Sequence, residues 1–550
     1  MTENPLLLGP LLRYVDETTA TIWVEVAQRG PVTATVGTRS FETHTFTVHG
    51  HHYALVEVDG LAAGTSTPYE LRVGDVAAWP PADSPYPPSR IRTVDHGARH
   101  RVLFGSCRTS VPHDAENNAT HGIDVLRTYA LQMPRTDERE WPDLVLLLGD
   151  QVYADETSDQ MREFIAARRD IERPPHTELK DYEEYAHLYY LAWSEPANRW
   201  LLSTLPSAMI FDDHDIRDDW NTSRAWRDEI NRNAWWHERV VSGLAAYWVY
   251  QHLGNLSPQA RADDRVWQEV RRVGRDGDAG QVLDELADQV DRDPARARWS
   301  FHRALGGSRF VVLDTRCGRM LDEGDRRMLS DAEMEWFESL ATGGVDHLFV
   351  ASSLPFFLPL GLHHLEAWNE AVAAGAWGPR AARLAERFRQ GVDLEHWAAF
   401  QKSFQAVATV VTSIARGERG RPPATVTFLG GDVHHSYMAA ARVRRRDPEQ
   451  SRILQIVCSP IRNPLPRVIR FASAASAYGL AWPMGRLVAR SARVPDPPYR
   501  WSLTDGPWFD NVLATLDLDG RRARVRWHTA DAGENESEPR LVLLRSATLT

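Results

Sequence analysis

The sequence predicts a mixed α/β protein that carries a small all-β domain at its N-terminus. From about residue 99 onward, short apolar runs such as PDLVLLLGD and TVTFLGGDV are separated by helical stretches. Continuous apolar runs are typical of strands that are covered on both faces. Before residue 95, segments such as TTATIWVEVA and HHYALVEVDG alternate polar with apolar or β-branched residues between Gly and Asp turns. That pattern predicts a small antiparallel β-sandwich.

The chain of 550 residues is longer than one hydrophobic core usually serves. We therefore expect an N-terminal β-sandwich of the fibronectin or immunoglobulin type over residues 1–95, and a larger domain over residues 96–550. The proline-rich stretch WPPADSPYPPSR would be the linker between them. Two charge-dense helical regions, within about 159–298 and 366–416, are expected to be insertions that decorate the larger domain.

The larger domain contains apolar runs that we interpret as strands of a sheet. They are RVLFGSC, PDLVLLLGD, SAMIFDDHD, SRFVVLDTR, VDHLFVASS, TVTFLGGDV and RILQIVCSP. Near the end of the chain, NVLATLDLDGRRARVRWHTA places an Asp-Gly turn between two alternating runs. Such a turn is a strong signal for a β-hairpin.

The composition narrows the class of protein. With 43% hydrophobic and 25% charged residues, the chain is predicted to be an ordinary globular protein. A net charge of −12 argues against a nucleic-acid partner, which would favour a basic face. Three cysteines provide no disulfide framework and fit a reducing compartment. Because neither a signal peptide nor an apolar run of spanning length is visible, we expect a cytoplasmic protein.

Polar side chains follow four of the predicted strands, in the segments GSC, GDQVYAD, DDHD and GDVHH. Open α/β sheets bind their ligands outside the carboxyl ends of the strands. We therefore expect these segments to converge on one site. It would contain carboxylates, imidazoles, a phenol and a thiol, which are the side chains that build metal centres.

The segment GDQVYAD places Asp150 directly after a glycine and Tyr153 three residues later. The glycine lets the strand turn sharply and present the carboxylate. Asp150 could bridge two metal ions, and the phenolate of Tyr153 is a hard donor that suits a ferric ion. An Asp that caps the next helix, with Tyr153 in the core, explains this segment about equally well.

The segment DDHD surrounds one imidazole with three carboxylates. Such a concentration of like charge is costly unless a cation or strong pairing offsets it, although a solvated loop would also tolerate it. Asp213 is therefore a candidate metal ligand, and His214 is a candidate ligand or general acid. Asn221, in the following DDWN, offers a further neutral oxygen donor.

In GDVHH, Asp432 and His434 are two residues apart and lie on one side of an extended chain, whereas His435 points the other way. Cys107 is either a thiolate ligand or a small buried hydrophobe. A cysteine phosphatase is excluded because His113, and not an arginine, lies six residues after the cysteine and no Gly-rich loop intervenes. Cys317 and Cys458 are interpreted as structural.

Arginines provide candidate phosphate ligands. Arg108 and Arg316 each follow a predicted strand and could fork onto phosphate oxygens, with salt bridging as the alternative for either one. Asp314 could position Arg316. The segment 462–493 holds six arginines and neither lysine nor acid, from Arg462 to Arg493. We expect it to be a cap whose arginines pair with the acidic insertions; a rim that attracts anionic substrates, or a contact with an anionic membrane, is the alternative.

The segment HGHH at residues 49–52 resembles a metal-binding tract, but it lies beside a turn in the β-rich region and far in sequence from the other candidates. We expect it to form a surface loop.

Taken together, GSCR, GDQVYAD, DDHD followed by DDWN, LDTR and GDVHHS resemble the alkaline phosphatase D (PhoD-like) family of calcineurin-like metallophosphoesterases, over about residues 101–459. GDQVYAD is also similar to a purple acid phosphatase block. The resemblance implies a four-layer metallophosphoesterase-type β-sandwich with flanking helices, and an N-terminal β-sandwich is common in such proteins. The first Asp-x-His block of most metallophosphoesterases is absent and GSC stands in its place, as in this family. The twin-arginine signal that many members carry is not visible.

The resemblance also implies an activity, namely hydrolysis of small phosphomonoesters or phosphodiesters by a metal-activated hydroxide, with Fe³⁺ and Ca²⁺ as cofactors. Asp150 would bridge the metals, and Tyr153 and Cys107 would bind a ferric ion. Asp213 stands where related enzymes often have a metal-binding Asn, and His214 is the adjacent catalytic imidazole. The matching final block contains Asp432 and His434.

Two other functions stay open at this stage. A phospholipase D-like phosphodiesterase that acts on lipid headgroups is weakly favoured by the arginine-rich segment. A non-catalytic metal-binding interaction protein would use the N-terminal sandwich as its binding domain and keep only a degenerate site. The presence of every polar block argues against the second of these.

Overall fold

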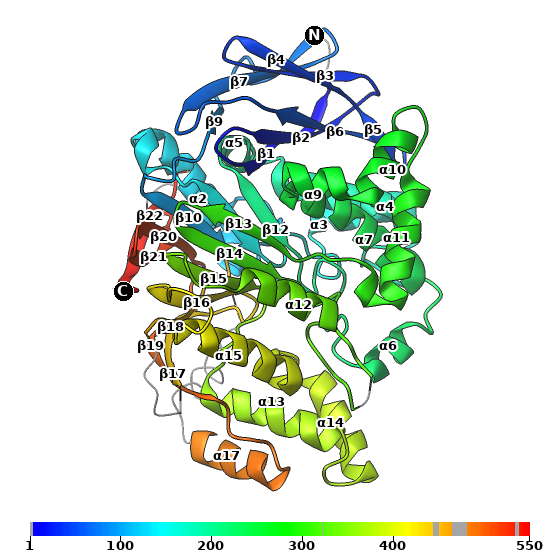
Figure 1. The fold of residues 1–550 in the computed structure, drawn as a ribbon. Helices are drawn as coiled ribbons and strands as arrows, with labels where there is room; N and C mark the ends of the chain where they lie inside the picture. The colour runs from blue at the N-terminus through cyan, green and yellow to red at the C-terminus, as the bar shows by residue number, and fades with distance from the viewer. Residues whose placement is uncertain (1–3, 323, 444–449, 465–480, 534–537) are drawn as a thin grey trace.

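The computed structural model describes residues 4–322, 324–443, 450–464, 481–533 and 538–550. Its N-terminal part consists of two β-sheets (Figure 1). One sheet has the order β1 (Leu6–Val15), β2 (Ala20–Val26), β6 (His51–Val58) and β5 (Phe46–Val48). The other has the order β4 (Arg39–His44), β3 (Pro31–Val36), β7 (Ser66–Val73) and β8 (Val76–Trp79), with β9 (Arg90–Arg92) paired to β7.

Alternation along the strands builds the core between these two sheets. On β3 every second side chain, at Val32, Ala34 and Val36, is buried among apolar residues of the facing sheet. The first sheet is buried on its other face as well, because Trp23 and Tyr53 belong to the core of the larger part of the molecule. The sandwich is therefore packed tightly onto the rest of the chain.

Two larger sheets follow. The first has the order β12 (Ser207–Ile210), β11 (Leu144–Leu148), β10 (His100–Gly105), β20 (Leu513–Asp519), β21 (Arg522–Asp531) and β22 (Arg540–Thr548). The second has the order β13 (Phe301–Leu305), β14 (Ser308–Leu313), β15 (His347–Ser352), β16 (Thr425–Gly430), β18 (Arg452–Val457), β17 (Ser436–Val443) and β19 (Tyr499–Trp508). The strand runs read from the sequence, and the hairpin β20–β21, are all present.

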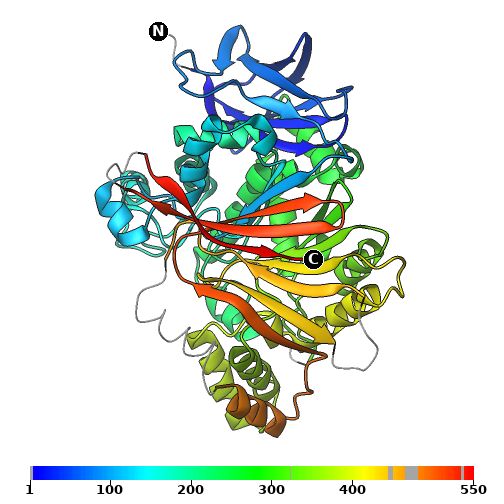
Figure 2. The same cartoon turned by 90° about the vertical axis from the view of Figure 1, so that its left-hand side faces the viewer.

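The parallel strands of each sheet point toward one edge. Strands β10, β11 and β12 are parallel to one another, and so are β14, β15, β16 and β18. One apolar core joins the two sheets, with Val102 and Val145 from the first and Phe349 and Ile456 from the second. The sheets lie beside each other in both views (Figures 1 and 2), and the indole of Trp527 on β21 donates to the carbonyl of Val457 on β18 at 3.2 Å.

Helices cover the outer faces of the sheets. In chain order up to the second sheet they are α1 (Ala115–His121), α2 (Val125–Gln132), η1 (Met133–Arg135), η2 (Glu138–Glu140), α3 (Asp159–Arg168), α4 (Tyr182–Trp193), α5 (Pro196–Thr204), α6 (Arg224–Ile230), α7 (Trp236–Tyr247), the π-helix η3 (Trp248–His252), α8 (Leu253–Asn255), α9 (Pro258–Asp263), α10 (Arg265–Gly274), α11 (Gly280–Arg292) and η4 (Pro294–Arg296). Those that follow are α12 (Asp331–Leu340), α13 (Leu360–Ala373), α14 (Pro379–Gly391), η5 (Trp397–Ala399), α15 (Gln401–Ala415) and α17 (Ala481–Ser491). Many begin at a side-chain cap; Asp181, for example, accepts from the backbone N–H of Glu184 at the start of α4.

The histidines of HGHH differ in their surroundings. His49 and Gly50 form the exposed turn between β5 and β6, as a surface loop requires. His51 is part of β6, and its ring nitrogens lie 2.8 Å from Glu25 and 2.9 Å from Glu183 of α4. The expectation of a surface loop is wrong for His51, because its ring bridges the sandwich and the helical insertion.

Within the described ranges, none of the helices has both the length and the apolar character that crossing a membrane requires.

Candidate metal centre

The polar segments meet where the parallel strands end. Cys107 follows β10, Asp150 follows β11 and Asp213 follows β12, while Asp432 arrives from β16 of the other sheet. The Cys107 Sγ lies 3.3 Å from Asp150 Oδ2. Carboxylate oxygens of Asp150, Asp212, Asp213 and Asp432 all lie within 4.8 Å of one another. Residues more than 280 positions apart along the chain thus form one acidic cluster.

The backbone at this cluster is strained. Five of the predicted site residues have positive φ angles: Cys107 at 57°, Asp150 at 48°, Asn221 at 61°, Asp432 at 62° and His434 at 48°. Residues other than glycine rarely adopt this conformation, and such strain concentrates at functional sites. The surrounding fold therefore holds these side chains in a costly arrangement.

Two glycines let the strand ends approach each other. Gly149, with φ of 99°, would place a Cβ only 2.7 Å from the Cβ of Asp212. Gly431 would place one 2.3 Å from the hydroxyl of Ser106. A larger residue at either position would push apart the segments that carry the carboxylates.

The carboxylates of the cluster are buried, and the positive charge around them does not offset their own charge. Asp150, Asp212 and Asp213 are at most 4% exposed. Burial raises the pKa of Asp150 well above its usual value, and the nearby Cys107 and Asp212 raise it further. Burial also raises the pKa of Asp212, although Arg316 opposes the shift. These groups resist ionisation unless more positive charge is supplied.

Orphaned oxygens indicate where that charge would bind. Among the described residues, Asp150 Oδ1, Asp212 Oδ2 and Asn221 Oδ1 are buried and have no hydrogen-bond partner. Such atoms are costly in a folded protein. Carboxylate and amide oxygens in this number are the ligands that hard cations use. The donor set therefore fits a metal centre.

Within the cluster, Cys107 and Tyr153 lie near Asp150. The Cys107 Sγ accepts from the Ser459 hydroxyl at 3.3 Å, and burial raises its pKa to about 12. Burial also raises the pKa of Tyr153 well above its usual value, and Cys107 and Asp150 contribute to the shift. The thiol thus contacts the carboxylate of Asp150, and the phenol of Tyr153 lies close enough to both for their charges to raise its pKa.

His214 is held by a carboxylate from the neighbouring segment. Its Nδ1 lies 2.9 Å from Asp155 Oδ1, and its ring lies 4.7 Å from that of Tyr153. Burial lowers the pKa of His214, but the charges of Asp155 and Asp213 outweigh burial and hold the pKa well above its usual value. Asp155 fixes the ring through Nδ1, and Nε2, which lies 3.8 Å from Asp218 Oδ1, is the nitrogen that could take part in chemistry.

A second buried histidine holds Asp432. His396 Nε2 lies 3.0 Å from Asp432 Oδ2, and its Nδ1 lies 2.8 Å from Glu366 Oε1. Glu366 belongs to α13, within the helical insertion. His434 is half-buried nearby, and burial lowers its pKa to about 4, with the charges of His214 and His435 adding to the shift. A neutral imidazole is the form that binds metals.

Comparisons with known proteins show the family to which this chain belongs. A family model described as a PhoD-like phosphatase matches residues 128–478, more than half of the chain. The chain belongs to the PhoD-like phosphatase family. The predicted relation to alkaline phosphatase D is thereby confirmed, and the protein is a hydrolase, a metal-dependent phosphoesterase.

A second family model, described as a domain of unknown function (DUF7800), matches residues 3–91. A solved structure described as PhoD shares this fold, with a TM-score of 0.59 and 13% identity over 100% of this chain and 94% of that one. Purple acid phosphatase PPD1 from seeds of yellow lupin (Lupinus luteus) gives a TM-score of 0.49 and 10% identity over 98% of this chain and 73% of that one. No match to this PhoD-like phosphatase is found among curated proteins. The solved PhoD structure supports the predicted mixed α/β fold with several sheets.

Arg108 of this PhoD-like phosphatase does not face the centre. Its Nε lies 2.9 Å from Asp124 Oδ2, and its NH1 donates to the carbonyl of Ala192 at 2.8 Å. Both Arg108 and Asp124 are buried. This placement does not support the expected contact of Arg108 with phosphate, because its guanidinium forms a buried ion pair with Asp124.

Arg316 does reach the cluster, but it contacts carboxylates. It is fully buried and pairs with Asp212, with Glu395 and, at 3.3 Å, with Asp213. Its placement does not support a direct contact with phosphate. Asp314 accepts from the backbone N–H of Arg316 at 2.8 Å, so it positions the turn and not the guanidinium.

Three of the four described arginines of segment 462–493 have side-chain partners, and none of these partners belongs to the acidic insertions. Arg462 is buried and donates to the carbonyls of Val111, Pro112 and Gly122. Arg486 and Arg490 pair with Asp496, just beyond the segment. The expected pairing partners were therefore wrong for these three. Arg467 and Arg470 lie outside the described residues.

Sequence reasoning missed several contributors to the site. Asp155 and Asp212 lie inside segments that were singled out, so their proximity in sequence was an available signal. Asp215 was also overlooked; its carboxylate accepts from the backbone N–H groups of Asp150 at 3.1 Å and Asp212 at 2.9 Å and so ties two strand ends together. Glu395 and His396 have no such signal, because they arrive from the insertion.

Proposed function

We propose that this PhoD-like phosphatase hydrolyses small phosphate monoesters or diesters at a centre of two or more cations. The observation that carries the proposal is the buried cluster of Asp150, Asp212, Asp213 and Asp432 with its unpartnered oxygens. The residues proposed to hold the cations are Cys107, Asp150, Tyr153, Asp213, Asn221, Asp432 and His434, to which the geometry adds Asp212.

We propose Fe³⁺ and Ca²⁺ as the cations. The thiol of Cys107 and the phenol of Tyr153, both beside Asp150, suit a ferric ion. The carboxylate oxygens and Asn221 Oδ1 suit Ca²⁺. When bound, such cations polarise the phosphoryl group and activate a water molecule as the nucleophile.

The protein's own residues would manage the proton and the charge. His214, oriented by Asp155 through Nδ1, would donate a proton from Nε2 to the leaving alkoxide. The charges of Asp155 and Asp213 keep that imidazole protonated. Arg316 would hold Asp212 and Asp213 in place and offset their charge, in place of the direct phosphate contact expected from the sequence.

Elemental analysis of the purified protein, beside one monoester assay and one diester assay, tests this function. We expect iron and calcium to be bound, and either or both substrates to be hydrolysed. Phenolate or thiolate bound to ferric iron should also produce a visible charge-transfer band that Tyr153→Phe alters. A colourless, iron-free preparation with full activity would refute the iron assignment, and metal-free activity on both substrates would refute the centre itself.

We also propose the finer organisation expected from the sequence: a four-layer arrangement of the two larger sheets, a domain boundary near residue 95, and a cytoplasmic location. The domain of unknown function that matches residues 3–91 supports the boundary. Three free, buried cysteines support a reducing compartment. Within the described residues, the paired arginines 462, 486 and 490 give no support to a lipid-headgroup substrate.

A further inference from the structure

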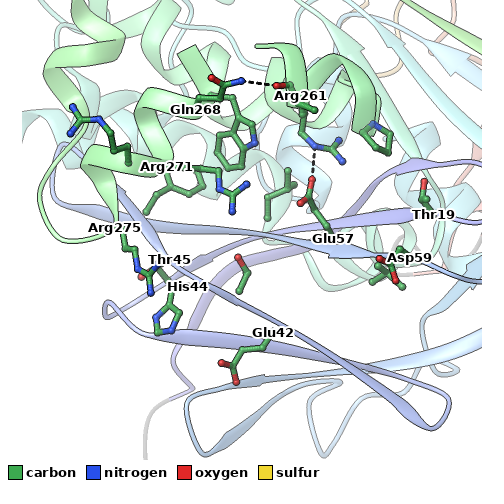
Figure 3. A pocket seen from close by; sticks show the side chains of 18 of the residues that line it. Thr19, Glu42, His44, Thr45, Glu57, Asp59, Arg261, Gln268, Arg271 and Arg275 are labelled. Atoms are coloured by element: carbon green, nitrogen blue, oxygen red, sulfur yellow. Dashed lines mark hydrogen bonds and ion pairs between the residues drawn. The ribbon is translucent and has the colours of Figure 1, made fainter. Parts of the chain in front are cut away.

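A groove lies between the N-terminal sandwich and helices α9 and α10 (Figure 3). Its volume is about 1080 Å³. Strands β4 and β6 form one wall, and the exposed face of α10 forms the other. None of the residues that line it belongs to the candidate metal centre, so the groove is a separate site.

Strand β4 presents an unpaired edge to this groove. It is the last strand of its sheet and pairs only with β3. The backbone N–H of Thr45 donates to Gly30 on the β3 side, and backbone groups alternate in direction along a strand. The N–H and C=O groups of Glu42 and His44 therefore point away from β3, and both residues line the groove.

Strand β6 is open on the same side. Strand β5 pairs with β6 only from His51 to Tyr53, because the chain crosses to the other sheet at Thr45. Beyond Tyr53, β6 keeps β2 as its neighbour on one side and has no strand on the other. Leu55 and Glu57 of this open stretch line the groove. Two strand edges without neighbours thus flank one cavity.

The helical wall is positively charged. Arg271 and Arg275 lie four residues apart on one exposed face of α10 and its C-terminal end, and Figure 3 shows both side chains at the groove. Neither forms a hydrogen bond or an ion pair with any described residue, although the guanidinium of Arg271 lies over the ring of Trp267 at 5.6 Å from its centroid. Arg261 and Arg272 are paired, with Glu57 and Glu269 respectively. Arg271 and Arg275 are therefore available to a ligand.

The wall is held rigidly. Trp267 of α10 packs edge-on against Phe46 of β5, with 5.3 Å between ring centroids. A Cβ at Gly274 would lie 3.0 Å from that of Phe46, so the helix lies directly against the strand. Arg29 donates to the carbonyls of Asp276 and Gly277. The groove is preformed and does not need to be opened by a ligand.

We propose that this groove binds an extended acidic peptide segment of a partner protein, which adds a strand to the edge of β4. Unpaired strand edges recognise peptides in this way. Alternate side chains of a strand lie about 6.6 Å apart, close to the roughly 6 Å rise between helix positions 271 and 275. Acidic residues at every second position would thus meet both arginines. The carboxylate of Glu42 on the other wall favours uncharged residues at the positions between them.

A displayed library of random octapeptides, selected on the full-length chain, tests this proposal. We expect enrichment of sequences with acidic residues at alternate positions. A synthetic peptide with the enriched sequence should bind at least tenfold more weakly to the Arg271→Glu/Arg275→Glu variant. The matched control is Arg380→Glu/Arg383→Glu on α14, where two exposed arginines lie away from the groove; it should bind like the wild type.

Backbone pairing is tested with the same peptide N-methylated at alternate residues, which keeps every charge but removes the N–H donors. Binding should again weaken at least tenfold. Three results would overturn the proposal. The first is that alternating acidic sequences are enriched no more on the wild type than on the Arg271→Glu/Arg275→Glu variant. The second is unchanged binding of the N-methylated peptide. The third is full competition by inorganic phosphate, which would make the groove a site for small anions.

Discussion

At the scale of single residues, Asp150 is the side chain on which the proposed centre depends most. It contacts Cys107 on one side and lies beside Asp212 and Asp213 on the other. A ligand shared by two cations loses its ability to bridge them when one carboxylate oxygen becomes an amide nitrogen. We therefore expect Asp150→Asn to lower kcat/KM for monoesters and diesters by about 10³-fold or more, as the loss of a metal-based catalyst requires.

Elemental analysis of Asp150→Asn should show less bound metal than in the wild type. Because burial of an unpaired carboxylate is unfavourable, the apo form of this variant should be no less stable than the wild-type apo form. Near-normal activity of the variant would mean that the centre lies elsewhere.

Asp155 leads to a prediction about how the reaction rate depends on pH. Asp155 contacts His214 and, together with Asp213, raises the pKa of His214. If His214 acts as the general acid, its protonated form is required, and this form persists to higher pH when the pKa is raised. Asp155→Asn should therefore lower kcat by about 10²-fold and shift the alkaline limb of the pH–rate profile to lower pH.

The control for Asp155 is Glu156→Gln, which removes the next carboxylate along the chain, an exposed one. It should leave both kcat and the pH profile unchanged. A loss of activity in Asp155→Asn with an unshifted alkaline limb would assign Asp155 a purely structural role.

At the scale of elements, the site divides into a part that was predictable and a part that was not. Asp150, Asp213 and Asp432 were found because an apolar strand followed by a polar turn is a local pattern, and parallel strands deliver such turns to one edge. Glu366 lies on helix α13, and His396 follows helix α14. Nothing in the local sequence of either residue distinguishes it from a surface residue. Only the packing of the helical insertion against β16 brings them to Asp432.

The arginines show the same limit. Arg108 and Arg316 each follow a strand, so the sequence offered no basis for a choice between them. In the structure Arg108 pairs with Asp124, the residue at which helix α2 begins, and Arg316 pairs with carboxylates of the cluster. Pairing between side chains distant in sequence is a property of the folded chain.

Helix α13 gives the prediction at this scale. Glu366 fixes His396, which in turn fixes Asp432, and outer partners of this kind usually contribute 10- to 100-fold to metal affinity. We expect Glu366→Gln to weaken metal binding by about 10-fold in equilibrium dialysis. Glu370→Gln, one turn further along the same helix, removes a carboxylate that accepts from the backbone of Gln401 instead. Equal metal affinities in the two variants would contradict the proposed role of Glu366.

At the scale of the whole molecule, the N-terminal sandwich is joined to the helical insertion by buried polar contacts as well as by apolar packing. Arg13 of β1 is fully buried and donates to the carbonyls of Tyr250 and Gln251 at 2.7 Å each. His51 contacts Glu25 of its own sheet and Glu183 of α4. The interface between the sandwich and the helical insertion therefore becomes stronger or weaker with the charge of His51.

That charge makes the interface sensitive to pH. Burial lowers the pKa of His51, but hydrogen bonds and charges of Glu25 and Glu183 outweigh burial and raise the pKa above 6.5. The stabilisation is then fully present below the unfolded pKa and is lost as the pH rises through the folded pKa. His51→Gln should lower the stability of the protein by about 1 kcal/mol near pH 6, and by much less near pH 9. Thermal unfolding of wild type and variant at both pH values measures the difference. In the control, His44→Gln at an exposed histidine, the change in stability should not depend on pH. If the effect of His51→Gln is also independent of pH, the His51 ring acts through packing alone.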